Sequence, residues 1–240
     1  MITKQILIDK IEIKFRKSKR AKNISIRIRP INGVIVTVPS FSTIKNAENF
    51  VYQKLSWIKK NLIKIQKLQK APTVFVRNKD YFTKFHKFRI SQSGDKFFIN
   101  KTRESIIANF PNNTDFKLPE IQNQIRNLLI GVYKEEAIGY LPERTHLLAF
   151  QNEFQFQKVS IRNTKTRWGS CSFKNNISLS LHLMRLPDEL IDYVILHELA
   201  HTLVKNHSSE FWNVLEAICL NSKVLDKKLK NYNLNTFYFE

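Results

Sequence analysis

The chain has 240 residues, of which 42% are hydrophobic, and Lys and Arg outnumber Asp and Glu by 40 to 20, which gives a formal net charge of +20. This composition excludes an intrinsically disordered chain, and no apolar run reaches the length of a membrane-spanning helix. The charge favours an anionic partner such as a nucleic acid or a nucleotide, although the lysines are spread along the whole sequence.

The two cysteines, Cys171 and Cys219, are too few to form a disulfide framework. The N-terminus lacks the apolar core and small-residue cleavage site of a secretory signal. We therefore expect a cytoplasmic protein without a membrane partner.

The first part of the chain is predicted to be rich in β-strands. Residues 24–29 alternate apolar and polar side chains, Asn32-Gly33 marks a tight turn, and residues 34–38 return as the second strand of a hairpin. The basic cluster Arg16–Lys22 precedes this hairpin. Its simplest interpretation is a solvated loop, and contact with phosphate or nucleic acid is the alternative.

Apolar residues then recur at helical spacing over 44–65, which predicts one amphipathic helix capped by Ser42 or Thr43. Residues 73–110 are again predicted to form strands. A polar, proline-containing stretch at 111–119 follows, and such stretches are typical of domain boundaries.

We accordingly expect a β-rich N-terminal region over residues 1–118 and a second domain over residues 119–240. The second domain is predicted to begin with a long helix that Gly139 and Pro142 kink or break. Strands are expected over 154–160 and, from the alternation of apolar and polar residues, over 177–183.

The sequence His-Glu-Leu-Ala-His at 197–201 carries the clearest chemical signal. On a helix, His197 and His201 point the same way and can bind one metal ion together, and Glu198 lies beside that ion as a general base. Pro187-Asp188-Glu189 is typical of a helix start. With His207 as a third ligand, the ion keeps an open fourth position, which is typical of catalytic sites.

The third ligand lies beyond the helix, so the chain must turn back after His201. We expect the helix to run on to Lys205 and to turn at Asn206, because Asn tolerates the left-handed conformation that ends helices. That turn would return His207 to the metal. The alternative third ligand is a carboxylate of the following helix, Glu210 or Glu216.

Two segments together resemble a known family. The turn Trp168–Cys171, the helix 190–201, Asn206-His207-Ser208 and Phe211-Trp212 are similar to the YgjP-like metallopeptidase family, a relative of the SprT-type zincins. The match covers residues 160–215 or so.

The resemblance implies an α+β fold, with a zincin-like metallohydrolase core at the C-terminal end and a β-rich N-terminal part. It also implies Zn²⁺ bound by His197, His201 and His207, with Glu198 as the catalytic glutamate that activates a zinc-bound water. The sequence thus predicts a zinc-dependent hydrolase, and a metallopeptidase acting on peptides or proteins is the first hypothesis.

Two alternatives stay open. A metal-dependent hydrolase of nucleotides or other phosphoanhydrides would use the positive charge, with Arg162, Arg167 and Ser170 as candidate substrate contacts. A basic protein associated with nucleic acid could instead hold a structural zinc, closed by a fourth ligand such as Cys171 or His182.

Overall fold

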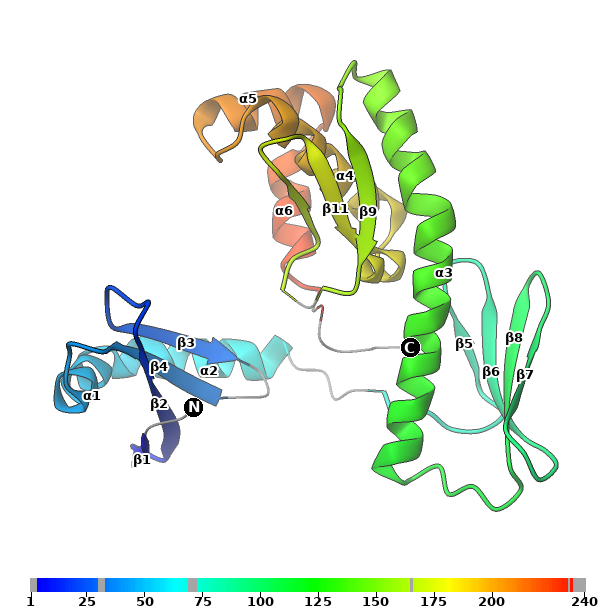
Figure 1. Ribbon diagram of the computed structural model, residues 1–240, viewed down its shortest axis with the longest axis horizontal. Helices are drawn as coiled ribbons and strands as arrows, with labels where there is room; N and C mark the ends of the chain where they lie inside the picture. Colours follow the sequence, from blue (N-terminus) through cyan, green and yellow to red (C-terminus); the bar gives the residue numbers. More distant parts are fainter. Residues whose placement is uncertain (1–3, 30–32, 69–72, 165, 233, 235–240) are drawn as a thin grey trace. The chain divides into compact units, whose positions relative to one another are not determined.

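The structure is a computed structural model that divides into two compact units, residues 1–71 and 72–240, described here one at a time (Figure 1). It describes residues 4–29, 33–68, 73–164, 166–232 and 234. Both units combine helices and sheets, which confirms the predicted α+β class. No helix within these ranges is both long and apolar enough to cross a membrane.

The first unit is a four-stranded sheet with two helices packed on one face. The strands are β1 (Lys4–Ile8), β2 (Ile11–Ser18), β3 (Ser25–Arg29) and β4 (Gly33–Pro39), and the helices are α1 (Ile44–Gln53) and α2 (Leu55–Leu68). The spatial order is β1-β2-β4-β3, with β2 and β4 parallel and the other pairs antiparallel. Alternate strand residues and the inner faces of the helices form the core, which contains Ile13, Phe15, Val34, Val36, Val38, Ala47, Val51 and Ile58.

Local sequence accounts for most of this unit. Strands β3 and β4 form the predicted hairpin, and Gly33 has a φ of 67°, which glycine adopts without strain. Thr43 caps α1 as predicted, because its hydroxyl accepts a hydrogen bond from the Asn46 N–H at 3.1 Å. The single helix expected over 44–65 is wrong: the backbone at Lys54 leaves the helical region (φ −102°, ψ 9°) and separates α1 from α2.

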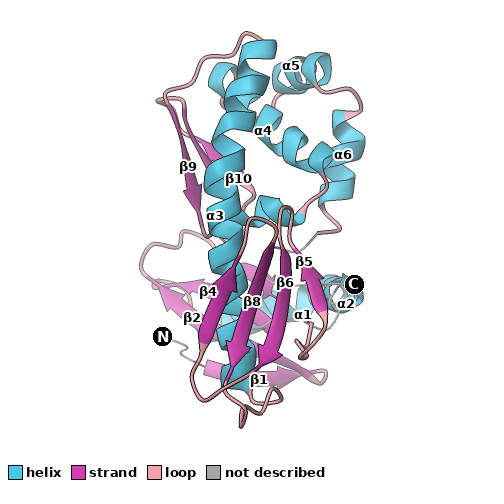
Figure 2. Ribbon diagram, turned by 90° about the vertical axis from the view of Figure 1, so that its right-hand side faces the viewer, coloured by secondary structure: helices cyan, strands magenta, loops and turns pink. Residues whose placement is uncertain are grey.

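The second unit begins with another four-stranded sheet, which shares its core with the long helix α3 (Pro119–Gln151) (Figure 2). Its strands, in the order β5-β6-β8-β7, are β5 (Asp80–Phe82), β6 (Lys87–Gln92), β7 (Phe98–Lys101) and β8 (Ser105–Phe110). Buried Gln122 of α3 bonds both the N–H and the C=O of Phe75, at 2.9 and 2.7 Å. The units therefore divide at residue 71, and not after residue 118 as the polar stretch suggests, because β5–β8 pack on α3.

Helix α3 runs without interruption through Gly139 and Pro142, so the predicted break does not occur. A proline cannot donate a hydrogen bond to the carbonyl four residues earlier. Here that residue is Ile138, which is 55% exposed, so water can replace the missing donor. Leu141 and Thr145, on the buried side, keep the helix packed across this position.

The C-terminal half of the second unit contains a small sheet, a 3-10 helix and three further α-helices. These elements are β9 (Lys158–Arg162), β10 (Gly169–Cys171), β11 (Asn176–Ser180), η1 (Leu181–Arg185), α4 (Asp188–Leu203), α5 (Ser209–Ile218) and α6 (Ser222–Leu229). The sheet order is β10-β11-β9, with β9 parallel and β10 antiparallel to β11.

Both strands predicted in this half are displaced or shortened in the structure. The strand expected over 154–160 lies at 158–162. The strand expected over 177–183 ends at Ser180, because the Ser180 hydroxyl accepts a hydrogen bond from the His182 N–H at 3.2 Å and caps η1.

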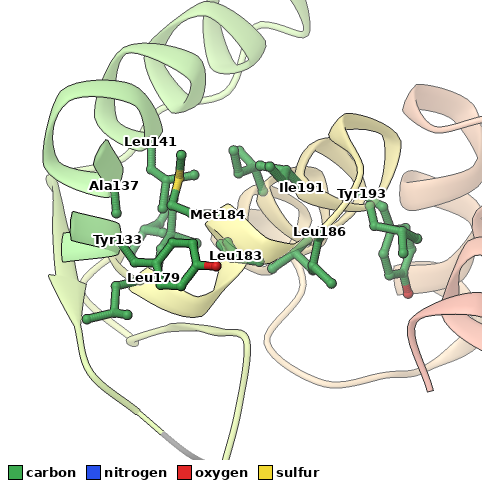
Figure 3. Packing of buried hydrophobic residues seen from close by; sticks show 14 of the residues in the cluster. Tyr133, Ala137, Leu141, Leu179, Leu183, Met184, Leu186, Ile191 and Tyr193 are labelled. Carbon is green, nitrogen blue, oxygen red and sulfur yellow. The ribbon is translucent and has the colours of Figure 1, made fainter. Parts of the chain in front are cut away.

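Helix α4 is held against α3 by apolar packing and by one bidentate ion pair. Tyr133, Ala137 and Leu141 of α3 face η1, where Met184 lies beside Leu141 (Figure 3). The Arg144 guanidinium donates to both carboxylate oxygens of Asp192, at 2.7 and 2.5 Å. These contacts fix the position of α4, on which the candidate site is built.

We expect Gly131→Ala and Gly139→Ala to stabilise the second unit. Both glycines lie on the exposed side of α3, and beyond the local helix backbone no heavy atom lies within 4 Å of a Cβ placed at either position. Alanine loses less backbone entropy in a helix, so each substitution should raise the free energy of unfolding by about 0.5–1 kcal/mol. Urea denaturation monitored by circular dichroism measures this change, and a loss of stability would contradict the described helix.

Candidate metal centre

Helix α4 begins where the sequence predicts. Pro187 occupies the cap position, and Asp188 and Glu189 place negative charge in the first turn, where the helix dipole favours it. The helix is buried along most of its length, and Leu190, Ile195 and Leu199 are completely covered. The polar residues near its C-terminal end, Glu198, His201 and Thr202, are buried with these apolar side chains.

Three imidazoles converge at the C-terminal end of α4. One nitrogen from each of His197, His201 and His207 lies within 4.8 Å of the others, and the Nε2 atoms of His197 and His207 are 3.1 Å apart. His201 Nδ1 lies 2.9 Å from the Val204 carbonyl oxygen. Because a carbonyl only accepts hydrogen bonds, Nδ1 carries the proton and Nε2 of His201 keeps its lone pair.

The chain returns to this cluster by a route that differs from the expected one. Helix α4 ends at Leu203, two residues before the predicted end, because β-branched Val204 adopts an extended conformation (φ −120°, ψ 111°). Asn206 is absent from the described residues with positive φ, so it is not the left-handed turn that we predicted. Its side-chain oxygen instead accepts a hydrogen bond from the Ser208 N–H at 3.1 Å and shapes the turn that carries His207.

Sequence reasoning missed the residue that packs against all three imidazoles. Phe211 of α5 is fully buried, and its ring centroid lies 4.4, 4.9 and 4.8 Å from those of His201, His197 and His207. The rings of Phe211 and His201 are stacked at 26°. Phe211 therefore restricts the orientation of the three imidazoles, a role that its position four residues after His207 does not reveal.

Glu198 lies on the same helix, next to His197, and is 6% exposed. Burial raises the pKa of its carboxyl to about 8, and the positive charge of Arg167 acts in the opposite direction. Its Oε2 atom is buried and has no hydrogen-bond partner within the described ranges. Burial also lowers the pKa of His197 to about 4, with the neighbouring His201 and His207 adding to the effect, so the His197 ring is neutral.

Gly169 of β10 makes room for this carboxylate. A Cβ at position 169 would lie 2.6 Å from Glu198 Oε1 and 2.7 Å from its Cγ, closer than carbon atoms approach one another in proteins. The structure shows that the side chain of Glu198 occupies that space.

A cavity of about 200 Å³ adjoins His197 and Glu198. Its walls come from β10 and the preceding loop, α4 and α6, and are formed by Trp168, Gly169, Tyr193, Val194, His197, Glu198, Asp226 and Leu229. Two of these residues carry carboxylates and none is Lys or Arg. A substrate group bound here therefore lies beside Glu198 and His197, and the lining residues offer an anion no Lys or Arg to pair with.

The other predicted substrate contacts are not among the residues that line this cavity. Arg162, at the end of β9, and Arg167, in the following loop, are exposed, and Ser170 on β10 is half-buried. Arg167 is close enough to Glu198 to act on its pKa. Lys165, which would add to this positive charge, lies outside the described residues.

The carboxylates considered as third ligands point elsewhere. Glu216 accepts a hydrogen bond from the Asn221 N–H at 3.0 Å, and Glu210 is exposed on the first turn of α5. Neither joins the cluster of three imidazoles, which is the metal-binding arrangement found among the described residues.

Three imidazoles that meet on a buried helix of an α+β domain are the arrangement expected of a metal-dependent enzyme. The chain matches the family model of the YgjP-like metallopeptidase domain over residues 22–232 and belongs to this family. Family membership places it among the metal-dependent peptidases. No curated protein matches the chain.

Three solved structures are similar to part of the chain. The metallopeptidase zymogen abylysin of Pyrococcus abyssi is 27% identical over 38% of this chain and 92% of its own, with a TM-score of 0.34. The metallopeptidase zymogen jannalysin of Methanocaldococcus jannaschii is 24% identical over 38% of this chain and 91% of its own, with a TM-score of 0.33. Wss1 of Saccharomyces cerevisiae is 24% identical over 40% of this chain and 83% of its own, with a TM-score of 0.32.

The family implies a divalent metal ion, and the residues present fit one. The imidazole nitrogens lie close enough together to share an ion, and the rings of His197 and His201 are held neutral by burial. On the same helix, one carboxylate oxygen of Glu198 is buried and has no hydrogen-bond partner among the described residues. Neutral imidazoles are common ligands of zinc and other divalent transition metals.

We expect the purified chain to bind one divalent ion, and His207→Ala to weaken that binding by at least tenfold, because it leaves two protein ligands. His146→Ala is the matched control, since His146 is exposed on α3 and packs on Phe156, outside the cluster. Metal content after dialysis and the rise in melting temperature on adding Zn²⁺ measure the effect. Equal metal content in the two variants would remove His207 from the site.

Proposed function

We propose that this chain is a zinc metallopeptidase in which His197, His201 and His207 bind the ion and Glu198 is the general base. The observation that carries the proposal is the convergence of three imidazole nitrogens within 4.8 Å, beside a buried glutamate of the same helix. Three protein ligands leave one tetrahedral position free, as in catalytic zinc sites.

When bound, zinc supplies a Lewis acid that polarises the substrate carbonyl and lowers the pKa of a water molecule toward neutrality. Glu198 takes up the proton of the attacking water on its unpartnered Oε2 and later delivers it to the amine that leaves. The peptide is thereby split into a carboxylate and an amine. Phe211 and the Val204 carbonyl hold the imidazoles in place during this sequence.

The edge of the small sheet supports a peptide as substrate. Strand β10 is the terminal strand in the order β10-β11-β9. The Trp168 carbonyl and the Ser172 N–H form hydrogen bonds with the chain of β11. Along a strand, the backbone groups of successive residues face opposite edges, so those of Gly169 and Cys171 face away from β11. An extended peptide can pair with this edge, which would bring its backbone next to Glu198.

The charge of the cavity favours this substrate over a phosphoanhydride. A nucleoside triphosphate bound there would face the carboxylate of Asp226, and the lining residues offer it no Lys or Arg. Contacts from Arg162, Arg167 and Ser170 would have to come from outside the cavity.

The arrangement of donors also favours an open site over a closed structural zinc. His182 Nε2 lies 2.9 Å from Asn163 Oδ1, and Cys171 Sγ lies 3.8 Å from Lys205 Nζ. Neither is part of the imidazole cluster among the described residues. A fourth protein ligand would require one of these contacts to break.

We expect Glu198→Gln to retain zinc and to lower peptide turnover by a factor on the order of 10²–10⁴, because the amide cannot accept the proton. Glu210→Gln is the matched control: it removes a carboxylate from the neighbouring helix, and parent-like zinc content and turnover are expected. Casein or an unfolded protein serves as substrate, and a nucleoside triphosphate is tested in parallel. If the chain released phosphate from the nucleoside triphosphate in a Glu198-dependent reaction and did not cleave the peptide, it would be a phosphoanhydride hydrolase and not a peptidase.

We expect Gly169→Ala to imitate the loss of Glu198, because the new methyl group would take the space of its carboxylate. Zinc content should stay that of the parent while turnover falls by about 10²-fold or more, since a displaced general base no longer reaches the water. Gly139→Ala, a glycine with open space, should keep full turnover. If both variants turned over peptide equally, the contact between Gly169 and Glu198 would not matter for catalysis.

A further inference from the structure

The positive charge of the chain is concentrated in its first unit. Residues 1–71 contain 17 Lys and Arg and 3 Asp and Glu, a formal net charge of +14. Residues 72–240 contain 23 Lys and Arg and 17 Asp and Glu, which gives a formal net charge of +6. General enrichment in lysine would spread the excess in proportion to length. The excess instead lies in the unit that contains none of the candidate site residues.

Part of this charge lies on the face of the first sheet that its own helices leave uncovered. Helices α1 and α2 pack against the inward side chains of the sheet, such as Phe15 and Val36. Arg16 lies next to Phe15 on β2 and therefore points to the opposite, outer face. Arg27, on β3, pairs with Ile35, which lies next to Val36 and shares that outer face.

The connection between β2 and β3 extends this charge beyond the sheet. It contains Lys19, Arg20 and Lys22, which are all exposed. We call these three residues, together with Arg16 and Arg27, the basic track. In register, Arg16 lies opposite Thr37 and Thr37 lies opposite Ser25. The track therefore follows β2 and β3, the two strands that flank β4, into the connection that joins them.

Among the described residues, the basic track has no acidic partners. The three acids of the first unit are engaged elsewhere, because Asp9 pairs with Lys59, Glu12 with Lys14 at 3.2 Å, and Glu48 with Lys4 at 2.7 Å. None of the five residues of the basic track forms an ion pair with a described residue. The positive charge of the track is therefore available to an external anion.

The spacing fits an anion with charges repeated along its length. Arg16 and Arg27 lie two strands apart and are offset by two residues along the strands, a separation of about 12 Å. A groove of duplex DNA is about 6 or 12 Å wide between its phosphate rows. Long, flexible Arg and Lys side chains can then reach phosphates on both sides of a groove. The side chains between them, Ile35 and Thr37, offer no ring on which an unpaired base could stack.

We propose that the basic track binds the phosphate backbone of a nucleic-acid duplex, without reading its sequence. This inference concerns the first unit and does not depend on the proposed peptidase function. It accounts for a charge excess that the metal centre and its cavity do not use, since the residues lining that cavity include two carboxylates and no Lys or Arg.

The test compares two triple variants of the full chain by fluorescence anisotropy with a labelled DNA duplex of about 20 base pairs, roughly two helical turns. One variant combines Arg16→Gln, Arg20→Gln and Arg27→Gln. The control combines Lys45→Gln, Lys54→Gln and Lys60→Gln, which removes the same charge from exposed positions on α1, on α2 and at the junction between them, on the helical side of the unit.

We expect the parent to bind the duplex with an affinity that falls steeply with salt. The track variant should bind at least tenfold more weakly near 0.1 M salt and reduce the slope of log K against log salt by about 2–3, since each lost phosphate contact contributes roughly 0.9. The control should change the slope by less than about one. Both variants should keep the parent's zinc content and peptide turnover, so this proposal and the peptidase proposal can fail separately.

Equal weakening by the two variants would overturn the proposal, because net charge alone would then explain binding. Tighter binding to a single strand of the same length would also overturn it, as would failure to bind duplex while binding vesicles that contain anionic lipid. Duplex binding that only the track variant loses would establish the surface.

Discussion

Helix α4 carries His197, Glu198 and His201 in surroundings that are otherwise apolar, and the architecture of the second unit follows from the need to compensate these groups. A buried polar group that finds no partner costs roughly 1–3 kcal/mol. The structure leaves Glu198 Oε2 without one among the described residues and brings three imidazole nitrogens to within 4.8 Å of one another. A cation at this point would resolve both problems, because neutral imidazoles donate lone pairs and a buried carboxylate is stabilised by nearby positive charge.

The elements around α4 act on this arrangement from different sides. Apolar residues of α3 and η1 support the helix, and the ion pair between Arg144 and Asp192 fixes it along its axis. Strand β10 supplies Gly169, which lets the carboxylate of Glu198 approach the backbone. Helix α5 supplies Phe211, which packs on all three imidazoles. Rigid placement matters for catalysis, since errors of about 1 Å in the position of a catalytic group can cost 10²-fold in rate.

Sequence was most informative where the chemistry is local. The spacing of the histidines, the start of α4 at Pro187 and the hairpin formed by β3 and β4 follow from periodicity and turn residues, and the structure contains each of them. Family resemblance and the family model agree on the metallopeptidase domain. These features depend on contacts between residues that are close in the chain.

Features that depend on distant contacts could not be predicted in the same way. Pro142 was expected to break a helix that exposure of Ile138 and burial of Leu141 keep intact. Phe211 and Gly169 owe their importance to α5 and β10 lying against α4, which no local pattern encodes. Helix α4 ends at Leu203 because Val204 is extended, whereas the local sequence predicts a later end at a left-handed Asn206.

The two units differ in formal net charge, and this difference favours different ligands on their surfaces. The first unit carries +14 over 71 residues, whereas two of the residues that line the cavity beside His197 are carboxylates and none is Lys or Arg. A polyanion is favoured at the basic track and disfavoured in the cavity, while an extended, uncharged backbone can pair with the edge of β10. A strongly basic sequence can therefore contain a cavity whose lining residues include no Lys or Arg, because most of the excess charge belongs to the other unit.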